Sequence, residues 1–226
     1  MNKIHPTAII DENVVLGDNN EIGAYTVIEG PTTIGNNNII SHHVVIGSPG
    51  EDTKDPWHDS SQARIEIGDH NIIREFTAIQ KPCYKDITKI QNNVFLMHGV
   101  HVPHDTIIED RVVVTPLCVI GGITTILEGA NIGMSAQIHQ YSVIGQFSLV
   151  AMGSALTKNV RPFTIYIGQR PPRVNLYALK KFGFEDFEDE ISKYVVEGTP
   201  PQSDELLIHI DRFEKLHVDS KRKLYS

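Results

Sequence analysis

Four of the 11 histidines in this chain, His98, His101, His104 and His139, lie in the C-terminal half of a regular six-residue repeat. His104 is followed directly by Asp105, and a carboxylate beside an imidazole fixes the imidazole tautomer and raises its basicity. Such a pair is what a general base needs in order to take a proton from an alcohol. Neighbouring residues on a flat strand point in opposite directions, so this contact requires the chain to bend between the two residues.

A large aliphatic residue recurs at every sixth position from Ile4 to Ile46, and the same period resumes at Ile67 and continues, with one further break, to Leu156. A helix repeats every 3.6 residues or so and an amphipathic strand every two, so neither explains this pattern. Short strands that each point one aliphatic side chain inward, joined by turns rich in Gly, Asn and Asp, do explain it. The sequence therefore predicts a triangular prism with three six-residue units, about 18 residues, in each coil.

Residues at positions 104, 122 and 140 are one coil apart, so they are expected to stack in a column that rises about 4.8 Å per coil. Gly122 would then lie directly above His104, where it leaves room for the imidazole and offers a backbone N–H to an oxyanion. His139 and Gln140 would lie about 10 Å from His104 and line a groove rather than share its proton.

Two segments interrupt the repeat, which is restored after each of them, at residues 48–64 and 81–88. Loops that leave a solenoid in this way are common places for function. The interruptions are therefore expected to be loop insertions within a β-helical domain that spans residues 1–160.

Beyond Leu156 the repeat ends, and several prolines mark a change of architecture. Apolar residues at helical spacing predict helices at Val174–Phe182 and Ser203–Lys223. We therefore expect residues 161–226 to form a small α-helical C-terminal region.

The chain has 226 residues, of which 40% are apolar and 21% charged, and a formal net charge of −8. This composition allows one elongated domain with a buried core, and the negative charge argues against nucleic acid as a partner. No segment has the apolar run of a signal peptide or the roughly 18 apolar residues of a membrane span. We therefore expect a cytoplasmic protein with no membrane span.

Cys83 and Cys118 are far apart and lack CxxC spacing, so neither a disulfide nor a thiolate metal site is predicted. A run of basic residues without any acidic residue lies at positions 157–184, and it predicts either an anion-binding surface or a solvated basic face. Its members are Lys158, Arg161, Arg170, Arg173, Lys180 and Lys181.

The segment NVFLMHGVHVPHD, at Asn93–Asp105, resembles the catalytic signature of the UDP-N-acetylglucosamine O-acyltransferases of lipid A biosynthesis. Four other segments resemble that family in the same order: IGSPGEDTKD, RIEIGDHNIIREFTAIQK, IHQYSVIG and VNLYALKKFGF. The similarity covers roughly residues 4–185. It implies an all-β left-handed parallel β-helix of the hexapeptide-repeat type with a small α-helical C-terminal region.

The resemblance also implies an activity, the transfer of a fatty acyl group from acyl carrier protein to a hydroxyl or amine of a UDP-amino sugar. His104 would be the general base, Asp105 would orient it, and the N–H of Gly122 would stabilise the oxyanion. The implied substrate-binding residues are Asp52, Lys54 and His101 for the acceptor, His139 and Gln140 for the acyl and nucleotide groove, and Asn175 and Lys181 for phosphate. The family implies a homotrimer, and neither a metal nor a bound cofactor, because the acyl-phosphopantetheine thioester belongs to the donor.

Three positions depart from the family pattern: Ile123, Tyr177 and Phe182. In the family pattern these positions belong to the part that recognises the acceptor. The resemblance therefore also allows an acyltransferase that acts on another nucleotide sugar. Three alternatives remain open: a coenzyme A-dependent acyl- or acetyltransferase, a zinc carbonic anhydrase that uses His98, His101 and His104, and a solenoid without catalytic activity.

Overall fold

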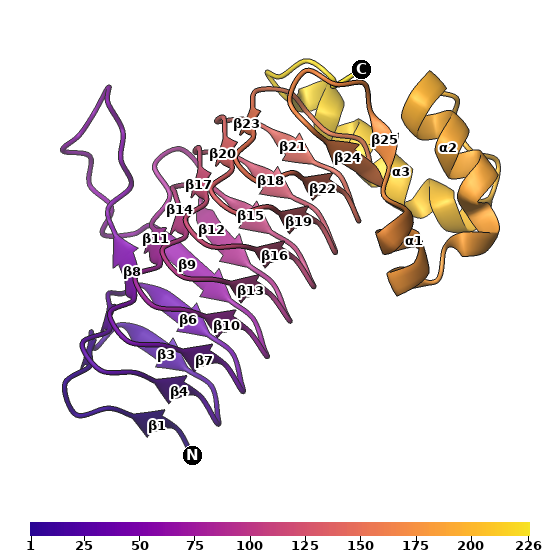
Figure 1. Ribbon diagram of the computed structural model, residues 1–226. Coiled ribbons are helices and arrows are strands. Elements are labelled where there is room, and N and C mark those ends of the chain that lie inside the picture. The colour runs from indigo at the N-terminus through magenta and orange to yellow at the C-terminus, as the bar shows by residue number, and fades with distance from the viewer.

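Short parallel strands stack into three sheets that form the sides of a prism (Figure 1). The computed structural model describes residues Met1–Ser226. Sheet A contains β1 (Lys3–Ile4), β4 (Glu21–Ile22), β7 (Ile39–Ile40), β10 (Ile72–Ile73), β13 (Phe95–Leu96), β16 (Val113–Val114), β19 (Asn131–Ile132), β22 (Leu149–Val150), β24 (Thr164–Tyr166) and β25 (Arg173–Val174). Sheet B contains β2 (Ile9–Ile10), β5 (Val27–Ile28), β8 (Val45–Ser48), β11 (Ala78–Gln80), β14 (His101–Val102), β17 (Val119–Ile120), β20 (Gln137–Ile138) and β23 (Ala155–Leu156). Sheet C contains β3 (Val14–Leu16), β6 (Thr32–Ile34), β9 (Arg64–Ile67), β12 (Ile87–Ile90), β15 (Ile107–Ile108), β18 (Thr125–Ile126) and β21 (Val143–Ile144).

The strand register follows the six-residue repeat. Ile4 pairs with Ile22 and Ile120 with Ile138, so a repeat aliphatic meets its counterpart one coil later. The two interruptions are loops after which the strands resume in register, because Ile46 pairs with Ile79 across the first one and Ile67 pairs with Ile90 across the second. The predicted coil is confirmed.

The repeat aliphatics form the core, a cluster of 31 buried residues inside the prism. Ile4 is the clearest exception, with 45% of its surface exposed. It lies in the first coil, which has a neighbouring coil on one side only.

Each coil turns three corners, which we name by the sheets that they join. At the B/C corner, Asp105, Ile123 and Tyr141 all have φ between +59° and +66°. At the C/A corner, Gly129, Phe147 and Phe163 have φ between +58° and +66°. Side chains at equivalent corner positions therefore stack in columns along the prism.

A second column, of buried asparagines, ties the first coils together. Oδ1 of Asn20 accepts hydrogen bonds from the backbone N and Nδ2 of Asn38, at 2.9 and 3.0 Å. Oδ1 of Asn38 accepts one from the backbone N of Asn71, and Oδ1 of Asn71 accepts one from Val94, both at 2.8 Å. These amides satisfy backbone groups that the turns leave without a ladder partner.

The parallel ladder continues past residue 160, because β24 pairs in parallel with β22, and β25 then returns antiparallel to β24. Four helical segments follow: α1 (Leu176–Phe182), the 3-10 helix η1 (Glu185–Phe187), α2 (Glu188–Glu197) and α3 (Asp204–Asp219). The two predicted helices are present as α1 and α3, and α2 is an element that the sequence analysis missed. None of these helices has the length and apolar character that crossing a bilayer demands.

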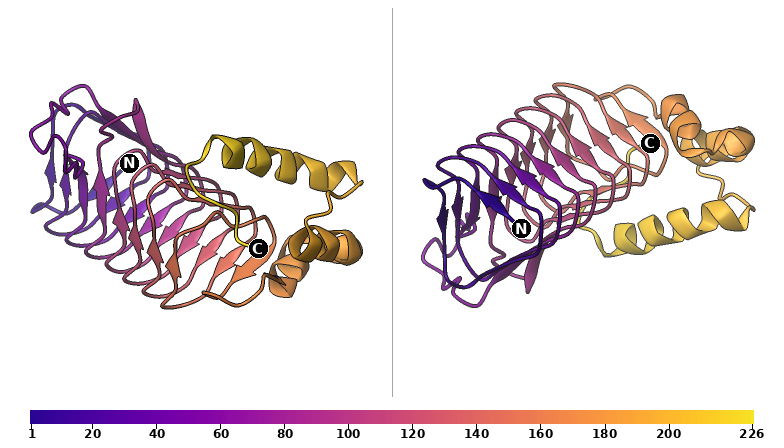
Figure 2. Two further views of the ribbon diagram at one scale, coloured as in Figure 1. Left: turned by 90° about the horizontal axis from the view of Figure 1, so that it is seen from above. Right: turned by 90° about the horizontal axis from the view of Figure 1, so that it is seen from below.

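Helix α3 turns back beside the prism (Figure 2), where Phe213 packs with Leu127 and Val143. Arg212 of this helix lies 2.7 Å from Glu109 of the prism. The chain then ends against the last coil, with the Tyr225 ring 4.6 Å from the Tyr166 ring. The C-terminal residues thus contact the prism at several points far apart in the sequence.

Candidate active site

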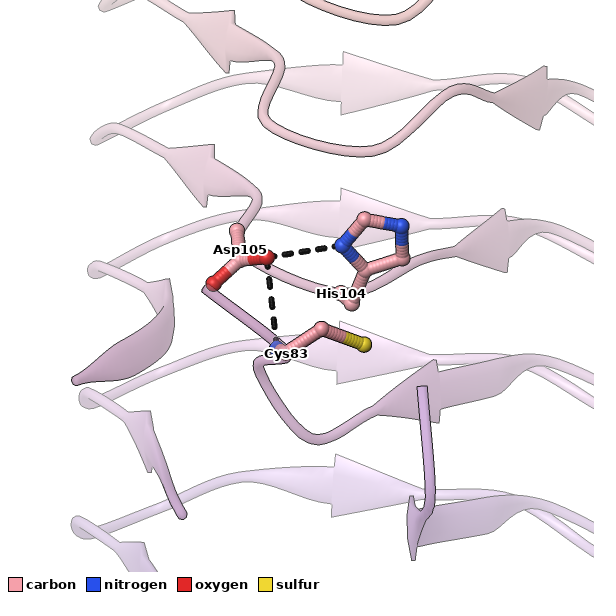
Figure 3. A group of neighbouring side chains, drawn as sticks. All are labelled: Cys83, His104 and Asp105. Carbon is pink, nitrogen blue, oxygen red and sulfur yellow. Dashed lines mark hydrogen bonds and ion pairs between the residues drawn. The ribbon is translucent and has the colours of Figure 1, made fainter. Parts of the chain in front are cut away.

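His104 lies at the B/C corner, just after β14, with 8% of its surface exposed. Its Nδ1 lies 2.7 Å from Oδ2 of Asp105 (Figure 3). The neighbouring side chains meet because Asp105 has a φ of +59°, which turns the chain at this corner. The bend that this contact requires is therefore present.

The Asp105 carboxylate is fully buried and is held by the loop between β11 and β12. The backbone N–H groups of Cys83, Tyr84 and Lys85 donate to its oxygens at 3.2, 3.2 and 2.7 Å. Burial would raise the pKa of this carboxyl, but the hydrogen bonds from His104 and these N–H groups outweigh burial and lower the pKa. Asp105 is therefore a fixed anion that orients His104.

The imidazole of His104 packs against Gly122 in the next coil. A β-carbon at Gly122 would lie 2.3 Å from Cε1 and 2.4 Å from Nε2 of His104, so only glycine fits. The backbone N–H of Gly122 makes no hydrogen bond within the protein. It is thus free to donate to a group that binds beside the imidazole.

A surface cavity of about 380 Å³ opens over this pair. Its lining is made by Glu51, His101, Pro103, His104, Val119, Ile120, Gly121, Gly122, Ile138, His139 and Gln140. A second cavity of about 300 Å³ continues along sheet B and is more apolar, with Val119, Ile138, Ala155 and Leu156 among its lining residues. The two share Val119, Ile120, Gly121, Ile138 and His139, so they form one continuous groove.

His101 points outward from β14 into this groove, and its Nε2 lies 3.9 Å from Oε2 of Glu51. Burial lowers the pKa of His101, and the nearby Glu51 carboxylate opposes that effect. The groove thus contains a second imidazole, His101, whose neighbouring carboxylate is Glu51. Glu51 was missed by the sequence analysis.

The loop between β8 and β9 brings Asp52 to the same region. Oδ2 of Asp52 accepts a 2.6 Å hydrogen bond from the hydroxyl of Tyr84, whose ring lies edge-on to His104 at 5.8 Å. Lys54 follows on the exposed side of this loop, with its backbone N–H 2.9 Å from Oδ1 of Asp52. Asp52 is thus linked to His104 through Tyr84, but neither Asp52 nor Lys54 is a lining residue of the cavity.

His139 and Gln140 line the cavity one coil beyond Gly122 and are bound by Arg222 of the C-terminal tail. Nε of Arg222 donates to the backbone oxygen of Gln140 at 2.7 Å, and a second guanidinium nitrogen donates to Nδ1 of His139. The sequence analysis missed Arg222, because it lies 83 positions from His139 and outside the repeat.

Asn175 and Lys181 lie elsewhere. Asn175 is buried as the N-cap of α1, where its Oδ1 accepts from the N–H of Ala178 and its Nδ2 donates to Phe147. Lys181 is exposed near the end of α1, which packs at the C/A corner. Within one chain the structure does not bring these two residues to His104, which is at the B/C corner.

The three departures from the family pattern have separate surroundings. Ile123 follows Gly122 at the B/C corner, with φ of +62°. Tyr177 is 73% exposed on α1. Phe182 packs on Phe147 at 4.7 Å between ring centroids, so it supports the docking of α1.

The basic run is not one surface. Arg161 is half-buried and stacks over the Tyr194 ring at 5.6 Å, and Lys158 lies over Tyr225 at 6.0 Å. Arg170, Arg173, Lys180 and Lys181 are exposed. Only these four remain candidates for contact with an anionic partner.

The three histidines of the zinc alternative diverge. His98 packs edge-on against Phe76 at the A/B corner, His101 points out from sheet B, and His104 is at the B/C corner. The three histidines are three residues apart within one coil, and this spacing places them on different parts of the prism. They therefore do not form a common three-histidine site.

Comparison with known proteins shows to which class of proteins this chain belongs. Residues 13–48 and 87–122 match the family model described as bacterial transferase hexapeptide (six repeats). The chain has the fold of the UDP-N-acetylglucosamine acyltransferase from Campylobacter jejuni, with a TM-score of 0.80, 24% identity and 99% of both chains covered. The UDP-N-acetylglucosamine acyltransferase from Bacteroides fragilis gives a TM-score of 0.73 at 28% identity, with 100% of this chain and 98% of that chain covered. The protein is a left-handed parallel β-helix and a hexapeptide-repeat acyltransferase.

Sequence relatives show to which family within this class of acyltransferases the chain belongs. The chain is 34% identical over 203 residues to the acyl-[acyl-carrier-protein]–UDP-N-acetylglucosamine O-acyltransferase of Thiobacillus denitrificans, with 81% of this chain and 79% of that protein covered. It belongs to the acyl-[acyl-carrier-protein]–UDP-N-acetylglucosamine O-acyltransferase family. A relative from Gloeothece citriformis with the same name is 36% identical over 166 residues, and the match spans 72% of this chain and 59% of that relative.

Proposed function

We propose that this protein transfers a fatty acyl group from acyl carrier protein to a hydroxyl of UDP-N-acetylglucosamine or a closely similar nucleotide sugar, in the cytoplasm. One observation carries the proposal: His104 is held by a buried Asp105 carboxylate at 2.7 Å while its ring packs on Gly122. This arrangement provides a base and an oxyanion donor next to each other at the wall of one groove.

The proposed reaction follows from that geometry. Nδ1 of His104 faces Asp105, so Nε2 accepts the proton of the acceptor hydroxyl as its oxygen attacks the thioester carbon. The N–H of Gly122 donates to the oxyanion of the tetrahedral intermediate. When the intermediate collapses, the carbon–sulfur bond breaks and His104 returns the proton to the departing thiolate.

We assign the two substrates to different parts of the groove, the acceptor to its polar part and the acyl chain to its apolar part. His101 lines the polar cavity, Asp52 is bonded to Tyr84 beside His104, and Lys54 follows Asp52 in the same loop, so these three residues are assigned to the acceptor. His139 lines both this cavity and the apolar cavity along sheet B, and Gln140 lines the first of them. The apolar cavity has the lining that an acyl chain requires. The exposed basic residues supply charge complementary to an acidic carrier protein and its phosphopantetheine phosphate.

The proposal is tested by acyl transfer from acyl carrier protein and coenzyme A thioesters, of several chain lengths and with or without a 3-hydroxyl, to UDP-N-acetylglucosamine and related nucleotide sugars. We expect turnover with acyl carrier protein as donor, and a loss of about 100-fold or more in His104→Ala. Turnover with coenzyme A alone would favour the alternative donor. No turnover from a folded protein with any sugar nucleotide would overturn the proposal.

We also propose a homotrimer in which Asn175 and Lys181 act in the site of a neighbouring subunit. Their position at the C/A corner, away from the His104 of the same chain, supports this arrangement. It is tested by light scattering and by mixing two inactive variants, His104→Ala and Lys181→Ala, under conditions that exchange subunits. Recovered activity in the mixture would support shared sites, and a monomer with full activity would contradict them.

A further inference from the structure

Residues 220–225 follow α3 and return to the last coil of the prism, and we call them the strap (Figure 2). The strap pairs with the backbone of Asn159. The N–H of Asn159 donates to the oxygen of Lys223 at 2.8 Å, and the N–H of Tyr225 donates to the oxygen of Asn159 at 2.8 Å. This pairing brings Arg222 of the strap to the wall of the groove.

The side chain of Asn159 is fully buried where the strap meets the prism, and one contact fixes its orientation. The backbone N–H of Val143 donates to Oδ1 of Asn159 at 2.8 Å, and a backbone N–H can only donate. Nδ2 of Asn159 therefore donates on the other side, to Nδ1 of His217 at 2.8 Å and to the backbone oxygen of Arg222 at 3.3 Å. Nδ1 of His217 must accept, so the proton of its neutral ring lies on Nε2.

A second proton on His217 is incompatible with this contact. An imidazolium carries an N–H at both ring nitrogens, so Nδ1–H would then point at the NH2 group of Asn159. Turning the amide over does not remove the conflict, because its NH2 group would then face the buried N–H of Val143. His217 is half-buried at the end of α3, so protons can reach it from the solvent while Asn159 stays buried.

The surroundings of His217 are otherwise an aromatic ring and exposed charges. Its ring stacks on Phe213 at 5.8 Å between centroids. The charged residues that flank it in the chain, Asp219 and Lys221, are exposed, and Lys221 lies over the Tyr141 ring at 4.1 Å.

Other titratable groups of α3 contact the protein further along the helix. Burial between Phe147 and Phe184 lowers the pKa of His209, so this second histidine of the helix stays neutral where an exposed imidazole binds a proton. The charged groups near α3 are Glu128 and Arg111 beside His209, Glu109 bound to Arg212, and Glu214 bound to Tyr194.

We propose that Asn159 and His217 form a latch that positions Arg222 at the groove, and that the latch is closed only while the imidazole of His217 is neutral. A proton from the solvent that binds to Nδ1 takes the lone pair that accepts the amide hydrogen bond, and the strap then leaves the coil. The strap is therefore held at higher pH and released at lower pH. Its effect on acyl transfer rests on the proposed function, and the latch itself does not.

The latch is tested by hydrogen–deuterium exchange of the C-terminal peptide in the full chain at about pH 7.5 and about pH 5.5, the range in which histidines titrate, with intrinsic exchange rates corrected. Protection of the Tyr225 N–H should fall at least about tenfold at the lower pH. In His217→Asn, Oδ1 takes the place of Nδ1 and accepts at either pH, so protection should change by less than about twofold. The matched control His209→Asn should keep the pH dependence of the wild type. Equal pH dependence in the wild type and His217→Asn would overturn the latch.

A second variant keeps the test decisive if His217→Asn loses its strap at both pH values. Asn159→Asp keeps an acceptor for Val143 and presents a carboxylate oxygen to His217, which favours the imidazolium. Its strap should be better protected at the lower pH, the reverse of the wild type, and the same direction in both proteins would contradict the proposal. Nitrogen NMR of the His217 ring should show the Nε2–H tautomer at the higher pH, and the Nδ1–H tautomer there would also contradict it.

The link to catalysis is tested by the KM for the nucleotide sugar in the wild type and His217→Asn at the same pH, so that protonation of His104 affects both alike. At about pH 5.5 the KM of the wild type should exceed that of His217→Asn at least about threefold, because Arg222 then leaves His139, and at about pH 7.5 the two should agree. Equal KM values at the lower pH would overturn this link. A strap that responds to pH in a protein without acyl transfer would leave the latch standing and remove the proposed function, whereas acyl transfer with a strap insensitive to pH would do the reverse.

Discussion

The guanidinium of Arg222 donates a hydrogen bond to Nδ1 of His139, 83 positions earlier in the chain. A guanidinium can only donate, so Nδ1 of His139 is an acceptor and the proton of its neutral imidazole lies on Nε2. Arg222 therefore sets the tautomer of a groove residue from the C-terminal tail, and makes Nε2–H the donor that His139 can offer to a substrate.

Arg222→Ala removes this control over His139 and the hydrogen bond to Gln140. We predict that the KM for the nucleotide sugar rises about tenfold, with a smaller change in kcat, because one oriented hydrogen bond to the substrate is lost. Steady-state kinetics checks this. Lys223→Ala removes the same charge from an exposed neighbour and should change KM little, so similar effects of both variants would point to charge alone.

Asp105→Asn keeps the size of the side chain but removes its charge. The amide cannot stabilise the imidazolium that His104 forms when it accepts a proton, and its NH2 group can donate to the wrong ring nitrogen. We predict a loss of about 100-fold in kcat with little change in KM. Single-turnover measurements check this, and a rate within a few fold of the wild type would contradict the orienting role.

The lowered pKa of Asp105 also makes stability depend on pH. A carboxyl whose pKa is lower in the folded protein than in the unfolded chain stabilises the fold above its unfolded pKa, about 3.9, and this stabilisation is lost as the pH falls through the folded pKa. The difference in Tm between wild type and Asp105→Asn should therefore be largest near neutral pH and shrink below about pH 4. Asp86→Asn, at an exposed position of the same loop, is the control.

Gly122→Ala places a methyl group against the His104 ring, where a β-carbon would be 2.3 Å from Cε1. The imidazole must move away from the oxyanion donor, so we predict a loss of activity of about 100-fold with the fold retained. Circular dichroism and kinetics together check this. Gly153→Ala has open space around it and should keep its activity, despite the cost of its φ of +65°.

Asn38→Ala interrupts the asparagine column. It leaves the buried N–H of Asn71 without an acceptor and removes the side-chain donor to Oδ1 of Asn20, which keeps its bond from the backbone N–H of residue 38. The free energy of unfolding should fall by about 2 kcal/mol. Chemical denaturation checks this value. Asn13→Ala, at an exposed turn, should change stability by less than about 0.5 kcal/mol.

The parts of the fold that depend on period could be predicted from the sequence. The inward aliphatics, the places of the two loops and the stacking of His104 with Gly122 all follow from one spacing that repeats along the prism. The His104–Asp105 contact could be predicted only conditionally, because it depends on a positive φ at Asp105.

Contacts between irregular segments could not be predicted in this way. Three such contacts depend on the paths of loops, which a sequence period does not describe. They are the backbone N–H groups that bind Asp105, the contact between Cys83 and His58, and the hydrogen bonds from Arg222 to the groove. Asn175 was assigned from a family motif, and its place as a helix cap at another corner became visible only in three dimensions.

The ladder of one coil on the next also bears on how such a chain changes over evolutionary time. Each strand of sheets A, B and C within the prism pairs only with its counterparts in the coils before and after it. Coils between the N-terminus and the loop that carries Asp52 can therefore be duplicated or deleted as whole units while the B/C corner at His104 keeps its geometry. The length of the molecule can therefore change in steps of one coil while the residues of the active site and their geometry stay the same.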